Sequence, residues 1–266
     1  MLLFLEATIV IGLAGGIAVA GRFLDWKGAI AGAALGYLYY MFGGRLYFAL
    51  VLTFLVVGGF STRYKYRVKY GEKGRGVRSW ANVCANGGLA AALAVFSRLY
   101  AIDSNISLAI FVGAISAGFT DTMATEIGML SKSKPVMITT LRGVERGTPG
   151  AVTALGLAGS LVAPLSLLAV SVLLDSERLL SSSLSSWAVL CTVTGFTGSL
   201  FDSVVGGLAQ SRYRCGECGH VVEVRRHCGR ETQYLSGFRY INNDVINLLA
   251  TTYGALTAYA LSLYLF

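Results

Sequence analysis

The stretch from Ile106 to Leu130 constrains the fold more than any other part of the chain. Its first half carries no charged residue, and its second half contains Asp121, Thr122, Thr125 and Glu126. An apolar helix of about 20 residues is long enough to cross a bilayer. Carboxylates inside such a helix are unfavourable unless they have partners, so they predict a functional site.

The composition indicates a membrane protein rather than a soluble one. Of the 266 residues, 55% are hydrophobic, only 14% are charged, and 33 are glycine. Soluble domains average about 25% charged residues, whereas glycine-rich apolar runs suit close helix packing in lipid. The net charge of +8 is attributed to loops that set membrane orientation, so nucleic acid is not an expected partner.

We predict an all-α fold: a polytopic transmembrane bundle that forms a single integral-membrane domain over residues 1–266. The expected membrane segments, eight in number, are 2–20, 28–42, 46–60, 81–100, 106–130, 150–174, 185–210 and 241–266. The segments 28–42 and 46–60 are short, and the sequence leaves open whether both cross fully. No basic region precedes the first segment, so we expect a spanning helix rather than a cleaved signal peptide.

Basic residues gather in the loops 61–80, 131–149 and 211–240, which the predicted segments place on one side of the membrane. Lys and Arg accumulate in cytoplasmic loops. We therefore expect this side to face the cytoplasm of a cell membrane, with the active site on it and both termini outside.

Polar residues inside the segments gather near the same side, within roughly 15 Å of the surface at a rise of 1.5 Å per residue. They are Asn82 and Asn86, with Ser79 just before their segment; Asp121 and Glu126; Ser199, Asp202, Ser203 and Gln210; and Asn243, Asp244 and Asn247. Asp121 and Glu126 are about 140° apart on an ideal helix. Either that helix unwinds near Thr122, or the two carboxylates have different neighbours.

These side chains offer the hard oxygen ligands that Mg²⁺ prefers. Mg²⁺ is usually held by one or two carboxylates together with substrate phosphates, so it implies a phosphorylated ligand. We expect Asp121, Asp202 and Asp244 to bind Mg²⁺ and, with Glu126, to be the catalytic residues.

The remaining polar candidates are assigned to substrate and nucleotide binding. They are Arg63, Lys65, Lys73, Arg75, Arg78, Ser79, Asn82, Asn86, Thr122, Thr139, Thr140, Arg142, Ser199, Asn243 and Asn247, with Gly147-Thr148 as further phosphate contacts. Lys and Arg neutralise phosphate. The basic run from Arg63 is also typical of a positive-inside anchor. The residues around Thr139 are equally typical of an ordinary polar loop.

The intramembrane carboxylates are also consistent with two roles outside phosphate chemistry. A polar network can simply fasten helices together, but this many acids and asparagines at one depth favour a site. Intramembrane acids also form ion or proton relays in transporters. Transporter sites usually lie near the bilayer midplane, whereas this site is shallow.

Several motifs in order resemble one known family. They are TRYKYRVKYGEKGRGVRSWANVCANG, FTDTMATEIG, KPVMITTLRGVERGTPGAVTALG, GFTGSLFDSVVGGLAQ and NNDVINLL, which together cover residues 60–250. The resemblance is to the integral-membrane family that includes the plastid phytyl-phosphate kinase and its animal transmembrane relatives. Members often read Ala-Asp-Thr where this chain has Thr120-Asp121-Thr122, a difference that keeps the carboxylate.

The resemblance implies transfer of a phosphoryl group from CTP onto an isoprenyl monophosphate, giving the diphosphate. The expected partners are thus a prenyl phosphate, a nucleoside triphosphate and membrane lipid; the length of the prenyl chain and the formation of a homodimer stay open. The alternatives are an ion- or proton-coupled transporter and a cytidylyltransferase-like lipid enzyme.

Cysteine spacing predicts a second metal site in the loop 211–240. Cys215 and Cys218 form a C-x₂-C pair, and His227 with Cys228 follow. Three Cys and one His are an ordinary structural Zn²⁺ set. His220 is an alternative to His227, because ligation by adjacent residues is less usual. The alternative to a metal site is a loop of reduced thiols.

Overall fold

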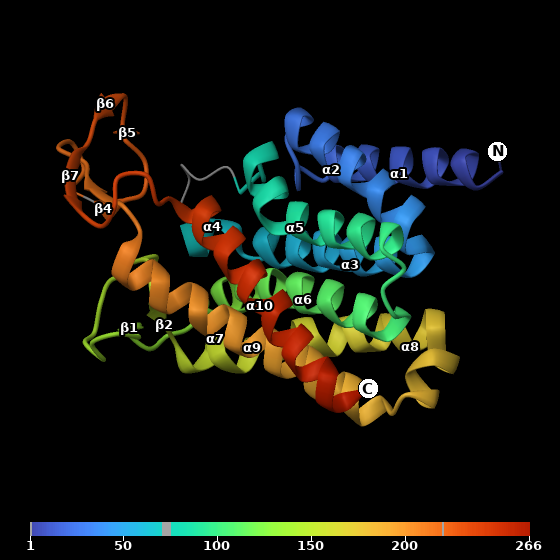
Figure 1. The fold of residues 1–266 in the computed structure, drawn as a ribbon. Helices are drawn as coiled ribbons and strands as arrows, with labels where there is room; N and C mark the ends of the chain where they lie inside the picture. Colours follow the sequence, from blue (N-terminus) through green and yellow to red (C-terminus); the bar gives the residue numbers. More distant parts are fainter. Residues whose placement is uncertain (1, 71–75, 220) are drawn as a thin grey trace.

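A computed structural model describes residues 2–70, 76–219 and 221–266. The described chain is mostly helical, and its helices lie side by side in one bundle (Figure 1). The helices are α1 (Leu2–Ala20), α2 (Trp26–Leu38), the π-helix η1 (Tyr39–Gly43), α3 (Gly44–Arg63), α4 (Tyr66–Tyr70), α5 (Trp80–Leu99), α6 (Ser104–Gly128), α7 (Ala154–Gly159), α8 (Val162–Ser181), α9 (Leu184–Ala209) and α10 (Asn243–Leu265).

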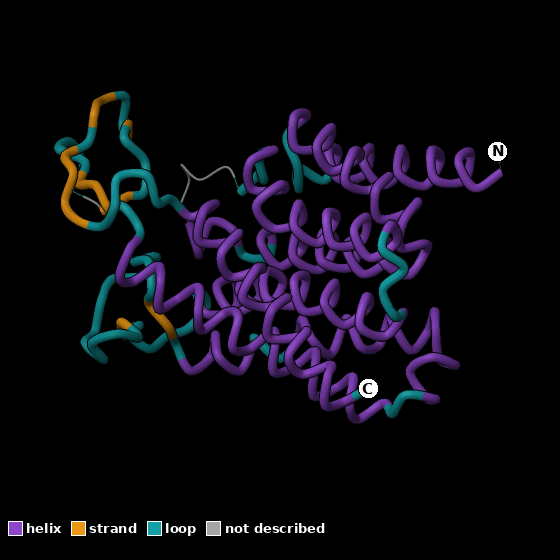
Figure 2. The backbone as a smooth tube through the Cα atoms, in the orientation of Figure 1, coloured by secondary structure: helices purple, strands orange, loops and turns teal. Residues whose placement is uncertain are grey.

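Short antiparallel strands lie at one end of the bundle (Figure 2). The first pair joins β1 (Val136–Met137) to β2 (Ala151–Val152). The others, all between α9 and α10, are β3 (Arg212–Arg214), β4 (Val221–Val222), β5 (Arg226–His227), β6 (Arg230–Glu231) and β7 (Gln233–Ser236). β3 is the central strand between β4 and β7, and β5 pairs with β6.

Seven helical stretches of the described chain are long and apolar enough to cross a membrane. One of them, Trp26–Arg63, folds back at Gly44, whose φ of +76° is incompatible with a continuous helix. The fold-back brings Phe48 against Gly36, where an added Cβ would lie 3.3 Å from the Phe48 ring. The predicted segments 28–42 and 46–60 are therefore the two antiparallel arms of a helical hairpin (Figure 1), and the other predicted segments match the remaining six stretches.

The predicted segment 150–174 matches the stretch Ala154–Ser181, but its first residues form a turn and a strand rather than a helix. Ala151 and Val152 pair with β1, and the six-residue α7 precedes the long helix α8. Gly150 has a φ of +80°, so the chain turns there before any helix begins. The apolar character of this stretch was recognised correctly, but it is shared by a strand, a short helix and a long one.

Helix α6 is the centre of the bundle. Every residue from Leu108 to Thr120 is buried, which requires neighbours on all sides of the helix. α6 lies between α3 and α5 on one side and α8, α9 and α10 on the other (Figure 1). The outer helices, α1 above all, instead expose many large apolar side chains, as expected for surfaces that face lipid.

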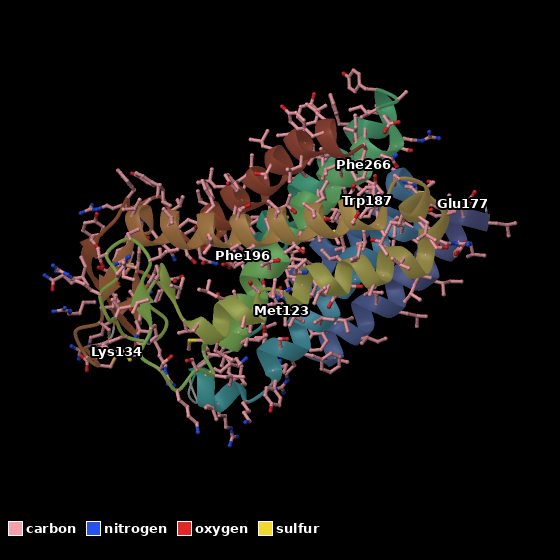
Figure 3. The ribbon with its side chains drawn as sticks, turned by 90° about the horizontal axis from the view of Figure 1, so that it is seen from below. Met123, Lys134, Glu177, Trp187, Phe196 and Phe266 are labelled. Carbon is pink, nitrogen blue, oxygen red and sulfur yellow. The ribbon has the colours of Figure 1, made fainter. Side chains whose placement is uncertain are left out.

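The two ends of the bundle differ in charge and structure. Lys134 lies at the end that carries the strands, where many nitrogen-tipped side chains gather, and Glu177 lies at the opposite end (Figure 3). The described N-terminal residue and the C-terminus lie at the end away from the strands (Figure 1). The described parts of the three basic loops therefore lie at one end of the bundle, as the sequence predicted.

Glycines set the distance between α6 and α10. A Cβ on Gly113 would lie 2.3 Å from Cβ of Ala258 and 2.5 Å from the carbonyl oxygen of Gly254. We predict that Gly113→Ala separates these helices and lowers the melting temperature in detergent, because overpacking destabilises by about 1–3 kcal/mol. The matched control Gly12→Ala, where no atom lies within 4 Å of the added Cβ, should leave the melting temperature unchanged or higher. Equal melting temperatures for the two variants would contradict this packing.

Candidate active site

A polar cavity of about 160 Å³ lies between α6 and α9, at the end of the bundle that carries the strands. Asp121 and Thr125 of α6 line it, together with Ser199, Asp202 and Ser203 of α9. The loop 146–150 that leads into β2 contributes further lining. The helical stripe predicted from Ser199 to Gln210 therefore does face the site.

Asp121 and Asp202 bring two carboxylates into this cavity from different helices. Ser199 donates a hydrogen bond of 3.3 Å to Oδ1 of Asp121. Oδ2 of Asp202 is buried and has no hydrogen-bond partner among the described residues. Two carboxylates in one enclosed space repel each other unless a cation or a proton compensates. Carboxylate oxygens beside the hydroxyls of Ser199 and Ser203 form a donor set that fits Mg²⁺.

Asp244 lies beside this cavity rather than in its wall. It sits in the first turn of α10 and accepts a 3.4 Å hydrogen bond from Nδ2 of Asn82. Asn86 donates to the backbone oxygen of Asn82 at 3.0 Å. The neighbouring Asn243 does line the polar cavity, while Asn247 is buried in α10. The predicted polar stretches of α5 and α10 thus meet each other next to the pair Asp121–Asp202.

Glu126 has a different neighbour from Asp121. It forms a buried ion pair with Lys69, whose Nζ also donates to the backbone oxygen of Ser61 at 2.6 Å. α6 remains helical through both acids, so an unwound helix at Thr122 is excluded. The alternative in which the two carboxylates serve different neighbours is confirmed, and Glu126 is not part of the polar cavity lining.

The loop 146–150 approaches the backbone of α9 closely. A Cβ on Gly150 would lie 2.5 Å from Cα of Gly207 and 2.7 Å from the backbone oxygen of Ser203. Arg212 ties the two segments together, since Nη2 donates to the backbone oxygens of Pro149 at 3.1 Å and of Gly207 at 2.8 Å. These contacts hold Gly147 and Thr148 against the cavity. Glycine at this turn allows a backbone approach that a side chain would block.

Sequence reasoning missed three residues of this region: Arg146 and Glu223, which line the polar cavity, and Lys69, the partner of Glu126. Arg146 was hidden among other basic loop residues, and Glu223 lies within the Cys/His loop. Desolvation by the surrounding protein raises the pKa of the Glu223 carboxyl; the charge of Asp244 adds to the rise, and the neighbouring Gln210 opposes it.

Most of the predicted basic residues lie away from the polar cavity. Arg63 donates to the backbone oxygen of Arg22, and the ammonium of Lys65 lies 5.4 Å from the Tyr64 ring centre. Thr122, Thr139, Thr140 and Arg142 are not part of the cavity lining. Ser79 accepts a hydrogen bond from the backbone N–H of Asn82 and caps α5. Lys73 and Arg75 lie outside the described residues.

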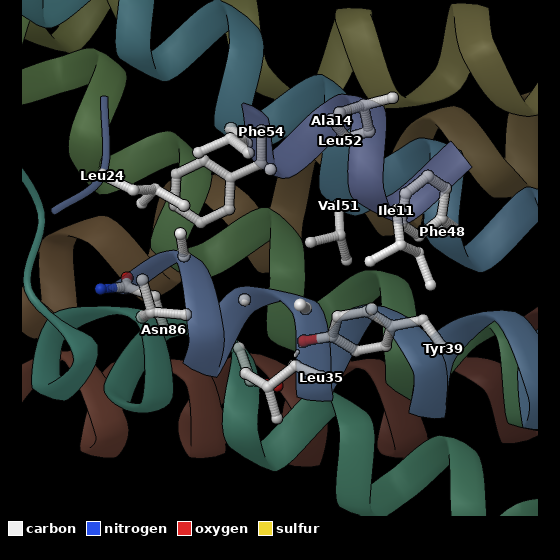
Figure 4. Close-up of a pocket in the computed structure, with 18 of the residues that line it drawn as sticks. Ile11, Ala14, Leu24, Leu35, Tyr39, Phe48, Val51, Leu52, Phe54 and Asn86 are labelled. Carbon is white, nitrogen blue, oxygen red and sulfur yellow. Dashed lines mark hydrogen bonds between the residues drawn. The ribbon is translucent and has the colours of Figure 1, made fainter. Parts of the chain in front are cut away.

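A second, apolar cavity of about 100 Å³ lies between α1, α2, α3 and α5 (Figure 4). Its walls are almost entirely hydrocarbon, including Ile11, Leu35, Phe48 and Val51. Its polar lining residues are Arg78, Asn82, Asn86 and Tyr39. The Arg78 guanidinium lies 5.0 Å from the centre of the Phe54 ring. The hydrogen bond from Asn82 to Asp244 therefore links this cavity to α10 and the edge of the polar one.

The predicted cysteine and histidine ligands also converge. The ligand atoms of Cys215, Cys218, His227 and Cys228 all lie within 4.8 Å of one another. The alternative ligand His220 lies outside the described residues. This cluster is separate from the carboxylates of the polar cavity, so the chain has two distinct sites suited to metals.

The fold and the polar cavity define a polytopic helical membrane protein with buried carboxylates near one end of its bundle. The chain belongs to the family described as "Integral membrane protein DUF92", whose model matches residues 9–255. An uncharacterized membrane protein of Methanocaldococcus jannaschii is 32% identical over 88% of this chain and 84% of its own length.

Two relatives come from Arabidopsis thaliana. Protein PGR is 30% identical over 91% of this chain and 90% of its own length. The chloroplastic Protein VTE6 is 26% identical over 88% of this chain, and the match spans 64% of that protein. No solved structure matches the chain significantly.

The buried ion pair between Lys69 and Glu126 gives a test of their structural role. We predict that Lys69→Met lowers the melting temperature strongly, because an uncompensated buried charge costs about 3–5 kcal/mol. The double variant Lys69→Met/Glu126→Gln should recover much of the loss, since neither charge is then left alone. Thermal unfolding in detergent measures the melting temperatures of both variants, and Lys65→Met, at an exposed lysine, is the control. A Lys69→Met protein as stable as the control would show that the pair contributes little.

Proposed function

We propose that this protein is a Mg²⁺-dependent kinase that transfers the γ-phosphoryl group of CTP to an isoprenyl monophosphate. The observation that carries the proposal is the polar cavity, where Asp121 and Asp202 meet the loop 146–150. Membership of the DUF92 family and the motif resemblance to the phytyl-phosphate kinase family support the substrate class. CTP as the donor rests on that resemblance alone.

Each part of the cavity has a role in this reaction. Asp121 and Asp202 would hold Mg²⁺, and Ser199 orients the Asp121 carboxylate through its hydrogen bond. Arg146 and the backbone N–H of Gly147 bind phosphate oxygens, while the N–H and hydroxyl of Thr148 shape the turn by donating to the backbone oxygen of Glu145. Bound Mg²⁺ supplies neutralisation of the charge on the transferring phosphoryl group.

The bond changes need little acid or base chemistry. An anionic oxygen of the acceptor phosphate attacks the γ-phosphorus of CTP. The bond from the γ-phosphorus to the β,γ-bridging oxygen breaks, and CDP leaves with that electron pair. The acceptor oxygen carries no proton to remove, so positioning and charge compensation provide the catalysis.

The apolar cavity is suited to the hydrocarbon chain of the acceptor. Its hydrocarbon walls bind a prenyl chain through burial, and Arg78 with Asn82 provides a polar end near Asp244. A cavity of about 100 Å³ is too small for a whole chain. We therefore assign it to the isoprene units next to the phosphate, with the remainder of the chain in the lipid beside α1.

The basic end of the bundle is assigned to the cytoplasm. Arg and Lys in short loops favour the cytoplasmic side, and CTP is supplied there. Both ends of the described chain lie at the other end of the bundle (Figure 1), so we propose that both termini lie outside.

The first test is turnover by the purified protein. With Mg²⁺, CTP and phytyl or geranylgeranyl monophosphate, we expect prenyl diphosphate and CDP in equal amounts. Asp121→Asn and Asp202→Asn should each abolish turnover and keep the melting temperature, since each removes a charge but little volume. Asp103→Asn at the opposite end of α6 is the matched control, because Asn caps a helix as well as Asp.

Three results would contradict the kinase. The proposal would be contradicted if folded protein yielded no diphosphate with any prenyl phosphate or nucleotide. Release of pyrophosphate in place of CDP would indicate a cytidylyltransferase-like enzyme. Counterflow of a solute in proteoliposomes without nucleotide consumption would indicate a transporter.

Two neighbouring glycines of α1 test the chain-binding cavity. Gly15 lines it and Gly16 does not, and neither has an atom within 4 Å of an added Cβ. We predict that Gly15→Leu fills the cavity and raises the KM for the prenyl phosphate several-fold, with little change in kcat. Gly16→Leu should leave both constants unchanged. Equal kinetic constants for the two variants would place the hydrocarbon chain elsewhere.

A further inference from the structure

The loop between α9 and α10 carries a cluster of ligands that the kinase reaction does not use. Nδ1 of His227 lies 3.4 Å from Sγ of Cys218 and 3.4 Å from Sγ of Cys228. Zn–S and Zn–N bonds of about 2.3 and 2.0–2.1 Å in a tetrahedron place sulfur and nitrogen about 3.6 Å apart. The observed separations therefore match two edges of a zinc tetrahedron, and Cys215 completes the set within the same 4.8 Å.

The backbone explains how adjacent residues can both be ligands. Cys228 has a φ of +51°, in the left-handed region that non-glycine residues rarely adopt, and Gly229 follows with +78°. This turn lets the side chains of His227 and Cys228 approach one centre. The other two ligands, Cys215 and Cys218, lie on a tight turn. The N–H of Gly219 donates to the backbone oxygen of Cys215 at 2.9 Å and closes this turn.

The loop has little apolar core to hold this geometry. Among its described residues, only Tyr213 and Cys215 are buried hydrophobic side chains, and all of β6 and β7 are exposed. All five cysteines of the chain are free. Units with so small a core usually depend on disulfides or a metal, and the thiols here are arranged for a metal.

The loop is also firmly attached beside the polar cavity. The N–H of Phe238 donates to the backbone oxygen of Ala209 at 2.8 Å. The N–H of Ser211 donates to the backbone oxygen of Ile241 at 2.9 Å. Glu223, which lines the cavity with Asp121 and Asp202, lies in the segment between Cys218 and His227. A metal bound by Cys218 and His227 would close this segment, and would thereby fix the carboxylate of Glu223 at the cavity.

We propose that Cys215, Cys218, Nδ1 of His227 and Cys228 bind one structural Zn²⁺, which holds Glu223 against the polar cavity. Four protein ligands fill the tetrahedral coordination sphere, so the metal has no open position for a substrate. The site is structural and its existence does not depend on the kinase activity.

Elemental analysis of the full-length protein, purified without chelators, tests the site. We expect about one zinc per chain, from the four-ligand count. The metal should be lost in Cys218→Ser/Cys228→Ser and in His227→Ala. It should be kept in His220→Ala and Cys84→Ser, which are the matched controls. Zinc-free wild-type protein, or zinc retained in the double variant, would overturn the proposal.

Two further measurements cover variants that fail to fold and the role of the metal. Wild-type protein loaded with Co²⁺ should show the visible absorption and thiolate charge-transfer bands of a tetrahedral thiolate site; their absence would overturn the assignment without any variant. Hydrogen exchange in residues 211–240 should become faster in the double variant, while α6 stays protected. Unchanged exchange in this loop would show that the metal does not hold Glu223.

Discussion

The contact of α6 with its neighbours through glycine is the constraint on which the rest of the structure depends. Added Cβ atoms on Gly195 and Gly198 of α9 would lie 2.4 Å from Oγ1 of Thr120 and 2.5 Å from Cβ of Ala117. Only glycine allows two helical backbones to approach so closely. Because α9 lies this near α6, Asp121 and Asp202 reach the same cavity. Wider spacing would leave each carboxylate buried without a shared ligand.

The arrangement separates the charged and apolar regions that the proposed kinase would use. Charged groups meet at one end of the bundle, where α6, α9 and the loop 146–150 form the polar cavity. An apolar cavity lies between α1, α2, α3 and α5. The hydrogen bond between Asn82 and Asp244 lies where the two regions approach each other, which is where the phosphate of a lipid acceptor would have to lie.

The two intramembrane acids of α6 show how position decides the role of a charge. Asp121 faces a cavity and has a hydroxyl partner, whereas Glu126 is neutralised by Lys69. A buried pair of this kind contributes little net stability, yet it is strongly destabilising when one partner is removed. Lys69 therefore anchors the basic segment after α3 to the end of α6. Burial raises the pKa of the neighbouring Tyr70 hydroxyl, and the charge of Glu126 adds to the rise.

The sequence alone determined the class of fold, the approximate segments, the common end of the basic loops and the polar stripe of α9. Hydrophobic length and helical periodicity are local properties, so they can be read without a structure. Only the tertiary structure decided that Glu126 pairs with Lys69, that Asp244 contacts Asn82, and that Glu223 and Arg146 line the polar cavity. It also decided between strand and helix at residues 151–152. These outcomes depend on contacts between residues far apart in the chain, and no local pattern encodes which of several equally polar side chains will meet.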